Sequence, residues 1–429
     1  MEIKREIRSY VLLALGITGL YLVARITGIA GQTAVVQKLL MAFLLGVGAT
    51  VLWLKKTGQW KAADLELLIL IVGMAVRIGY TLATGCEVRS HDLEEFSLES
   101  GGHAGYLLTL LTTGQLPDSI VGQYYQQPLF YLLGSLVSAF VNGILNCEEA
   151  YWLVDAAKLV SCFASCAVLL IVRRFANFCG LKEEGRRVTL LLLSFLPAFW
   201  LSGGRVAPDA LTAFFMVLEF CYTFYWWRDP SWKHTLLLAV IYGCGLMTKI
   251  SCGVLAPVTA LLFLFRLVQA WKEKRVWEYA EKYIAFAGIS LPLGLWYGIR
   301  NFMRFGQSLT YVASPNRKLY RGGYPLAQRL LIPNLPNLLQ TLYADPRTDY
   351  NAPVYYLKTA LFGEFSYAVP AWILAFLLLT AVLLSGMAVY ALYWKLCRDR
   401  EDRKGLFLAT GISGAAVVLF GLKRKSLSQ

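Results

Sequence analysis

Charge is scarce in this sequence, and its scarcity excludes the soluble classes of protein. Of the 429 residues, 16% are charged and 57% are hydrophobic, and the mean hydropathy is positive. A soluble domain carries about a quarter of charged residues. Cysteine pairs with zinc spacing are absent from the sequence, as are the short alternating segments that a membrane β-barrel needs. With soluble proteins and membrane β-barrels excluded, the remaining class is a helical membrane protein.

The apolar residues are grouped in runs that are long enough to cross a bilayer as helices. A hydrocarbon core of about 30 Å needs roughly 20 apolar residues. The predicted spans are 10–29, 34–54, 65–84, 151–172, 188–204, 209–227, 235–250, 253–270, 283–300, 367–394 and 405–422. We therefore predict an all-α polytopic membrane protein with about 11 transmembrane helices.

The net charge of +14 suggests nucleic acid as a partner, but its distribution predicts a membrane topology instead. Excess Lys and Arg in short loops mark the cytoplasmic side of a membrane. The basic loops are KREIR near the start, KKTGQWK at 55–61, the segment 173–187, KEKR at 272–275 and KLCRDREDRK at 395–404. We expect no nucleic-acid partner, a cell-membrane location and a cytoplasmic amino terminus. The terminal LKRKSLSQ does not fit this topology, because it would lie outside.

Outer loop one, residues 85–150, is the most polar region outside the cytoplasmic loops. Its segment 104–113 is apolar on one face and too short to span, which favours a helix at the membrane surface. Segment 128–145 suits an interfacial or a re-entrant helix, since a full span would move the basic loops outside. Cys86 and Cys147 lie near the two ends of this loop, and a disulfide between them is left open.

Outer loop two, residues 301–366, is basic and rich in tyrosine. Such a long loop is usually functional. Its positive charge suits either a phosphate-bearing partner or anionic lipid. The basic side chains are Arg304, Arg317, Lys318, Arg321 and Arg329.

Ionisable residues in or beside membrane spans are functional candidates by default. Asp155 and Lys158, three residues apart on one helix face, could pair with each other, or Lys158 could extend to the membrane interface. Arg77, inside the third span, has no evident partner in the sequence. Four further charges lie at predicted outer span ends, on the same side as Asp92, and would frame a polar cavity: Arg205, Asp209, Lys249 and Arg300. Each of them alone also suits an interfacial anchor.

Such a cavity suits transfer of a sugar from a lipid phosphate. A carboxylate takes the proton of the acceptor hydroxyl, and Arg or Lys side chains stabilise the departing phosphate. Asp92 has the chemistry of this base, although a helix N-cap or turn role is the alternative. His91 and His103 lack a defined ligand set, so we expect loop hydrogen bonds and no metal.

Seven segments, in order over most of 65–390, carry a resemblance to a known family. They are SHDL at 90–93, GHAGYLLTLLTTGQLPD at 102–118, QYYQQPLFYLL at 123–133, LSGGRVAPDAL at 201–211, GLMTKISCG at 245–253, LWYGIRNFMRFGQSL at 295–309 and LFGEFSY at 361–367. On these residues the sequence resembles a bacterial family 39 glycosyltransferase of the GT-C superfamily, related to protein O-mannosyltransferases and aminoarabinose transferases. The resemblance implies a GT-C-type bundle with two large outer loops.

The resemblance also implies site residues. Asp92 matches the family's catalytic carboxylate, and Lys249 and Arg300 match residues that hold the lipid phosphate. We assign binding of the phosphate or the sugar to Lys249, Arg300, Arg205, Asp209, His103 and Tyr125. The chain departs from the family at Gln126, Gln127, Phe130 and Tyr131, where His and Pro pairs are frequent, and at RVAPD, where related sequences are Asn-rich.

The leading prediction is a membrane glycosyltransferase with an inverting, Asp-base mechanism. Its donor is a polyprenyl-phosphate sugar, its acceptor is a protein, a lipid or a glycan at the outer face, and membrane lipids surround it. No cofactor is expected. A lipid or glycan transporter or flippase, and a catalytically degenerate family member, are the alternatives. The expected regions are a hairpin at 1–64, the GT-C-like catalytic region at 65–395 and a last loop and helix at 396–429.

Overall fold

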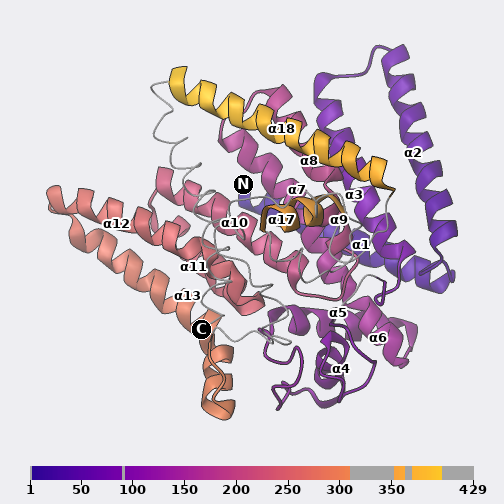
Figure 1. Cartoon of the computed structure of the whole chain (residues 1–429), viewed down its shortest axis with the longest axis horizontal. Coiled ribbons are helices and arrows are strands. Elements are labelled where there is room, and N and C mark those ends of the chain that lie inside the picture. The colour runs from indigo at the N-terminus through magenta and orange to yellow at the C-terminus, as the bar shows by residue number, and fades with distance from the viewer. Residues whose placement is uncertain (1, 89–91, 310–351, 363–369, 399–429) are drawn as a thin grey trace. The chain divides into compact units, whose positions relative to one another are not determined.

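The chain is mostly helical in the part that this computed structural model describes, residues 2–88, 92–309, 352–362 and 370–398 (Figure 1). No β-strand occurs among these residues, so the all-α class is confirmed. The helices are α1 (Glu2–Ile26), α2 (Thr33–Lys56), α3 (Ala62–Ala83), α4 (His103–Thr113), α5 (Leu129–Leu145), α6 (Ala150–Ala156), α7 (Lys158–Phe178), α8 (Glu183–Phe195), α9 (Pro197–Ser202), α10 (Asp209–Arg228), α11 (Trp232–Thr248), the 3₁₀ helix η1 (Ile250–Leu255), α12 (Ala256–Lys272), α13 (Val276–Phe305), α17 (Ala352–Phe362) and α18 (Ala371–Arg398).

Six helical segments in the described part are long and apolar enough to cross a membrane, judged by length and composition. They are Ile7–Ile26, Thr33–Lys56, Asp64–Ala83, Ala150–Phe178, Asp209–Arg228 and Ile250–Lys272. Four more predicted spans overlap α8 with α9, α11, α13 and α18. The last predicted span, 405–422, lies outside the described residues. The protein is therefore a multi-pass α-helical membrane protein.

The chain divides into two compact units. One comprises Met1–Cys252 and Ala280–Leu309, and the other comprises Gly253–Tyr279 and Thr310–Gln429. In the second unit α17 packs on α18 through a small apolar core. All seven residues that the sequence predicts for the site lie in the first unit.

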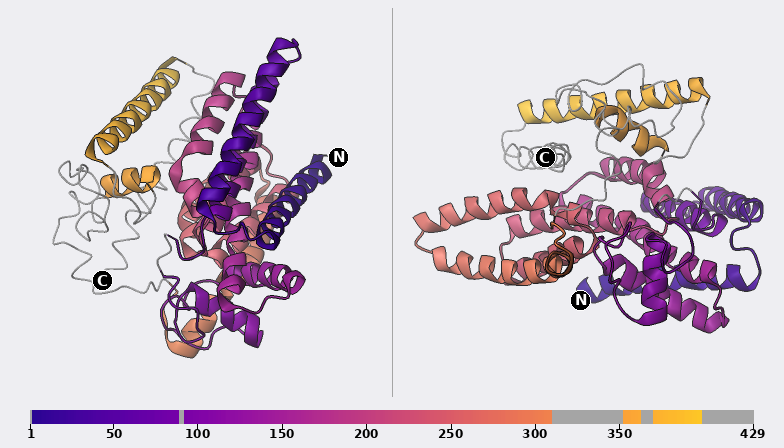
Figure 2. Two further views of the ribbon diagram at one scale, coloured as in Figure 1. Left: turned by 90° about the vertical axis from the view of Figure 1, so that its right-hand side faces the viewer. Right: turned by 60° about the horizontal axis from the view of Figure 1, so that its bottom comes forward.

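Helix α7 is the centre of the first unit. It packs against α1, α3, α5, α8 and α10, and most of the span that it forms with α6 is buried. A helix covered on all sides must be apolar all round, which explains the near-continuous apolar run in this part of the sequence. Helices α4, α5 and α6 contact one another and gather at one end of the unit (Figures 1 and 2).

The structure corrects one expectation for outer loop one and answers one question that the sequence left open. Segment 104–113 forms α4 as predicted, but protein covers it on nearly all sides, with every residue from His103 to Leu108 buried. Its apolar face therefore packs in the core, not on a membrane surface. Cys86 and Cys147 are both free thiols, so the disulfide left open by the sequence is not formed.

The predicted span 188–204 is divided into two helices. Helix α8 ends at Phe195 and α9 begins at Pro197, because a proline ring disfavours helical geometry at the preceding residue. Leu196 is accordingly extended, with ψ of 114°. This break leaves the last carbonyl groups of α8 without helical partners.

Arg77 supplies the missing partners. Its guanidinium, fully buried on α3, donates hydrogen bonds to the carbonyl oxygens of Leu193 and Ser194, both at 2.8 Å. It also donates to Ser165 Oγ at 3.0 Å. A cation at the carbonyl end of a helix is favourable. The charge that had no evident partner in the sequence therefore closes the end of α8.

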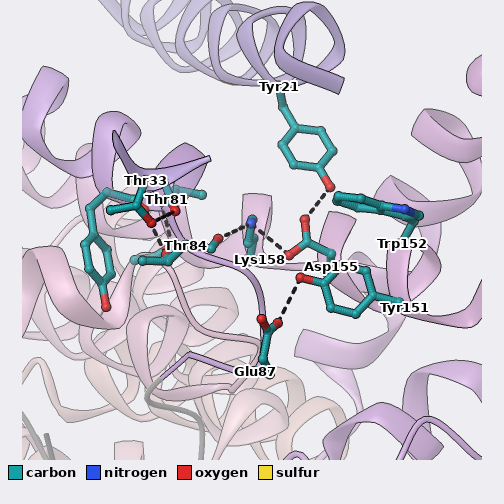
Figure 3. Close-up of polar contacts among 12 residues, drawn as sticks. Tyr21, Thr33, Thr81, Thr84, Glu87, Tyr151, Trp152, Asp155 and Lys158 are labelled. Atoms are coloured by element: carbon teal, nitrogen blue, oxygen red, sulfur yellow. Dashed lines mark hydrogen bonds and ion pairs between the residues drawn. The ribbon is translucent and has the colours of Figure 1, made fainter. Parts of the chain in front are cut away.

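Of the two alternatives for Lys158, the structure shows the ion pair with Asp155. Lys158 Nζ lies 2.8 Å from Asp155 Oδ1 and donates to the carbonyl oxygen of Thr84 at 2.7 Å (Figure 3). Tyr21 donates its hydroxyl to Asp155 Oδ2 at 2.5 Å. This buried network joins α1, the end of α3 and the α6–α7 pair.

Candidate functional site

The backbone at Asp92 lies directly against the start of α4. The amide of His103 donates to the carbonyl oxygen of Asp92 at 2.8 Å, and the amide of Ala104 donates to that of Leu93 at 3.2 Å. These bonds satisfy amides that a helix N-terminus leaves open. The N-cap of α4 is Gly102, so capping this helix is not the role of the Asp92 side chain.

Two backbone features keep this contact close. Asp92 has φ of 63°, a left-handed conformation that aspartate tolerates better than most residues. Gly102 has no side chain, and an added Cβ would overlap the carbonyl oxygen of Leu93. The predicted base is therefore held at the N-terminus of α4, with its side chain half-buried.

His103, the first residue of α4, is buried beside Tyr131 of α5. Its Nδ1 lies 2.7 Å from the hydroxyl oxygen of Tyr131. The Tyr131 ring stacks on Tyr106, with centroids 3.8 Å apart and planes inclined by 7°. His103 is thus fixed at two points, through its amide to Asp92 and through its ring to Tyr131.

Asp209 and Lys249 join the ends of two neighbouring helices. Asp209 is the first residue of α10, Lys249 follows the last residue of α11, and Nζ lies 2.6 Å from Oδ1. Their side chains are 43% and 35% exposed, so the pair contributes little to stability but leaves charge accessible to a ligand.

Arg205 lies one turn before this pair, in the loop between α9 and α10. It is largely buried, and Asp209 interacts electrostatically with Lys249, His103 and Arg205. Gly204 permits the close packing of this loop, because an added Cβ would lie 2.7 Å from the Tyr80 ring. Two predicted cations and one histidine therefore surround a single carboxylate.

Tyr131 connects the two halves of the site. Burial raises the pKa of its phenol, and Tyr125, Tyr297, Asp209 and Asp92 raise it further. These neighbours come from four separate parts of the sequence, so Tyr131 lies within electrostatic range of both the predicted base and the Asp209–Lys249 pair. Four of the seven predicted residues thereby interact with Tyr131, namely Asp92, His103, Tyr125 and Asp209. Two more, Lys249 and Arg205, interact with Asp209.

Arg300 on α13 lies beside Tyr297 of the same helix. It donates to the carbonyl oxygen of Pro117 at 3.0 Å, and its guanidinium is 5.4 Å from the centre of the Tyr297 ring. Asp118 lies 3.7 Å away. Arg300 thus holds the loop after α4, and its contact with a lipid phosphate stays a prediction.

Tyr131 is the site residue that sequence reasoning missed, since it was noted only as a departure from the family. The sequence shows many tyrosines in this region and no signal that singles out one facing a histidine. His91 and the basic residues Arg317, Lys318, Arg321 and Arg329 lie outside the described residues. Within the described ranges, no three His, Cys, Asp or Glu side chains form a cluster that could hold a metal ion.

The fold and this site define a multi-pass helical membrane protein with a carboxylate, a histidine and several cations gathered in one unit. No protein-family model matches the chain, and no curated protein matches it. A similar solved structure is the crystal structure of ArnT from Cupriavidus metallidurans in the apo state, with a TM-score of 0.41 and 15% identity over 83% of this chain and 76% of that chain. A similarity this slight carries no argument about function, which is argued below from the chain's own residues.

Proposed function

We propose that this protein is a membrane glycosyltransferase that takes a sugar from a polyprenyl-phosphate donor. The observation that carries the proposal is the gathering of Asp92 and His103 with the Asp209–Lys249 pair in one unit. A transferase of this kind needs a base and an anion site next to each other. Membrane spans on the same chain suit a donor with a lipid tail.

In the proposed reaction, the acceptor hydroxyl oxygen attacks the anomeric carbon while Asp92 takes its proton. The bond from the anomeric carbon to the phosphate oxygen breaks, and polyprenyl phosphate leaves with the electron pair. Attack from the face opposite the phosphate inverts the anomeric centre. We expect the active site to face the outside of the cell membrane.

The leaving phosphate gains negative charge as this bond breaks. Lys249 and Arg205 suit its stabilisation, because charge-assisted hydrogen bonds strengthen as the charge develops. Asp209 would hold Lys249 in place until the phosphate arrives. Side-chain cations thus supply the positive charge in the proposed reaction.

One observation favours the alternative of a lipid or glycan transporter. Glu219, ten residues along α10 from Asp209, is fully buried, and neither of its carboxyl oxygens has a hydrogen-bond partner among the described residues. Ionisable residues deep in a span often mark transport or proton pathways. The sequence reasoning missed this residue because it lies within a long apolar run.

The deciding experiment follows release of free polyprenyl phosphate by the purified protein from a panel of polyprenyl-phosphate sugars, with acceptor extracts added. We expect release by the wild type and none by Asp92→Asn, which removes the base with little change in shape. Glu95→Gln, an exposed carboxylate of the same loop, is the matched control and should act as the wild type does. Equal activity of Asp92→Asn and wild type would remove Asp92 from the mechanism.

If the wild-type protein releases no polyprenyl phosphate, the transporter alternative should be tested next. The same protein in liposomes would then be tested for movement of a fluorescent polyprenyl phosphate between leaflets. Movement that Glu219→Gln abolishes, without any cleavage, would replace the transferase by a transporter.

A further inference from the structure

Glu219 lies near the middle of α10, a helix that is long and apolar enough to cross a membrane. Its side chain is fully buried, and neither of its carboxyl oxygens has a hydrogen-bond partner among the described residues. The proposed transfer reaction does not use this group. The protonation state of Glu219 must therefore follow from its immediate surroundings.

The carboxyl group of Glu219 packs directly against the backbone of α11. An added Cβ at Gly245 of that helix would lie 2.4 Å from Glu219 Oε1. The same Cβ would contact Cys252 of η1 and Phe215 of α10, at 3.2 and 3.3 Å. A glycine backbone, a thiol-bearing residue and an aromatic residue therefore border the carboxyl group, and solvent does not reach its oxygens.

No charged group in the described part of the chain offsets the burial of Glu219. Helix α10 packs on α7, α9 and α11, and α9 carries no titratable side chain. None of the titratable side chains on α10, on the other two helices or on η1 acts on Glu219 electrostatically. These side chains are Asp209, Cys221, Tyr222, Tyr225 and Arg228 on α10, Lys158, Cys162, Cys166, Arg173 and Arg174 on α7, Lys233, His234, Tyr242 and Cys244 on α11, and Cys252 in η1.

The two protonation states of such a group differ widely in free energy. A carboxylate loses its hydration on burial, and here neither a cation nor a hydrogen bond from the described residues replaces it. A carboxylic acid has no net charge, so its burial costs far less. A buried carboxyl group in these surroundings therefore keeps its proton at a pH at which exposed glutamates are ionised.

We propose that Glu219 is a proton-binding site in the middle of a membrane span and that it holds one proton at neutral pH. Release of this proton requires water or a cation to reach the carboxyl group. Because the group packs between α10 and α11, its ionisation is coupled to separation of these two helices. The proposal is independent of the proposed function, since it concerns a group outside the transfer reaction.

Infrared spectroscopy of the purified protein in liposomes measures this protonation state directly. Protonated and ionised carboxyl groups absorb at different frequencies, and ¹³C labelling of glutamate separates its bands from those of aspartate. In the difference between wild type and Glu219→Gln at neutral pH, we expect loss of one protonated carboxyl group. Glu219→Leu replaces Glu219→Gln if the latter does not fold. Loss of carboxylate bands in place of the protonated band would overturn the proposal.

Glu66 of α3 provides a matched control, because its side chain is also buried but is paired with Arg173 and Arg186. Glu66→Gln should remove carboxylate bands and leave the protonated band of the wild type unchanged. Equal loss of the protonated band in Glu66→Gln and Glu219→Gln would contradict the assignment. A wild-type spectrum without a protonated glutamate at neutral pH would overturn it whether or not the variants fold.

The pH dependence of unfolding is a second readout. An unfolded chain ionises its glutamates above about pH 4.3, whereas the folded protein would keep the proton on Glu219. Unfolding then releases one proton, so a rise in pH favours the unfolded state. Between about pH 5 and 7, the unfolding equilibrium constant of the wild type should rise about tenfold more per pH unit than that of Glu219→Gln. Equal slopes would refute the site, and neither slope depends on the outcome of the transfer assay.

Discussion

Lys249 Nζ lies 2.6 Å from Asp209 Oδ1, and this ion pair joins the end of α11 to the start of α10. The two residues are forty positions apart, and each stands at a helix end. Exposed pairs of this kind stabilise a protein by about 0.2–1 kcal/mol. Stability alone is therefore a weak reason for this arrangement, which suits the proposed anion site.

Replacing Lys249 should affect ligand binding more than folding. Lys249→Ala is expected to raise KM for the lipid-linked donor and to lower kcat/KM by about 10- to 100-fold, the effect of losing one or two charge-assisted hydrogen bonds. The melting temperature should stay nearly unchanged. Steady-state kinetics and thermal unfolding of purified protein measure both effects. Lys233→Ala, an exposed cation at the start of α11, is the control and should act as wild type.

Gly102→Ala should destabilise the contact between the Asp92 loop and α4. The added methyl group meets the carbonyl oxygen of Leu93, so the backbone must move at a cost of about 1–3 kcal/mol. Gly143→Ala, in α5 with open space around its Cα, is the comparison and should be neutral or slightly stabilising. A melting temperature for Gly102→Ala that equals that of wild type would show that the loop is not packed as described.

Replacing one partner of the buried Asp155–Lys158 pair should destabilise the protein more than replacing both partners. Lys158→Met leaves the Asp155 carboxylate without its cation, and we expect a loss of about 3–5 kcal/mol. Adding Asp155→Leu to that variant should restore part of the stability, because no buried charge then remains unpaired. Thermal unfolding of the two single variants and the double variant completes a double-mutant cycle. Strict additivity would contradict the coupling.

Glu219→Leu should stabilise the folded protein. Both carboxyl oxygens are buried without a hydrogen-bond partner in the described part of the chain, which costs about 1–3 kcal/mol for a polar group. A leucine of similar volume removes this cost and packs beside Phe215 and Gly245. A rise in melting temperature is expected. A fall would indicate that the carboxyl has a partner of functional importance.

The positions of the helices could be predicted from the sequence because the signal is local. A run of apolar residues is sufficient for a span, and the spacing of Asp155 and Lys158 is sufficient for a pair on one helix face. The break at Pro197 was visible in the sequence but was outweighed by the apolar residues on both sides of it. Local pattern therefore predicted the class of fold and most of its elements.

Contacts between distant segments could not be predicted in the same way. Three partners of Arg77 lie 88, 116 and 117 residues away. Nothing in the pattern at 104–113 indicates which protein surface covers its second face. The site residues could be named because charged helix ends are rare in such a chain, but the hydrogen bond between Tyr131 and His103 depends on how α4 and α5 pack. The sequence thus predicts which residues are site candidates but not how these residues are arranged in space.

The contact of Arg77 with the end of α8 also has a consequence for membrane insertion. Arginine in the middle of an isolated span costs about 2.5–3.5 kcal/mol. The ribosome adds Leu193 and Ser194, whose carbonyl groups Arg77 binds, 116 and 117 residues after Arg77. At typical rates of synthesis this is a delay of roughly 6–24 s. During that interval α3 cannot settle at its final depth, because its guanidinium must remain near water or lipid headgroups. We therefore expect the third helix of this protein to enter the bilayer early and to reach its native position only when the eighth arrives.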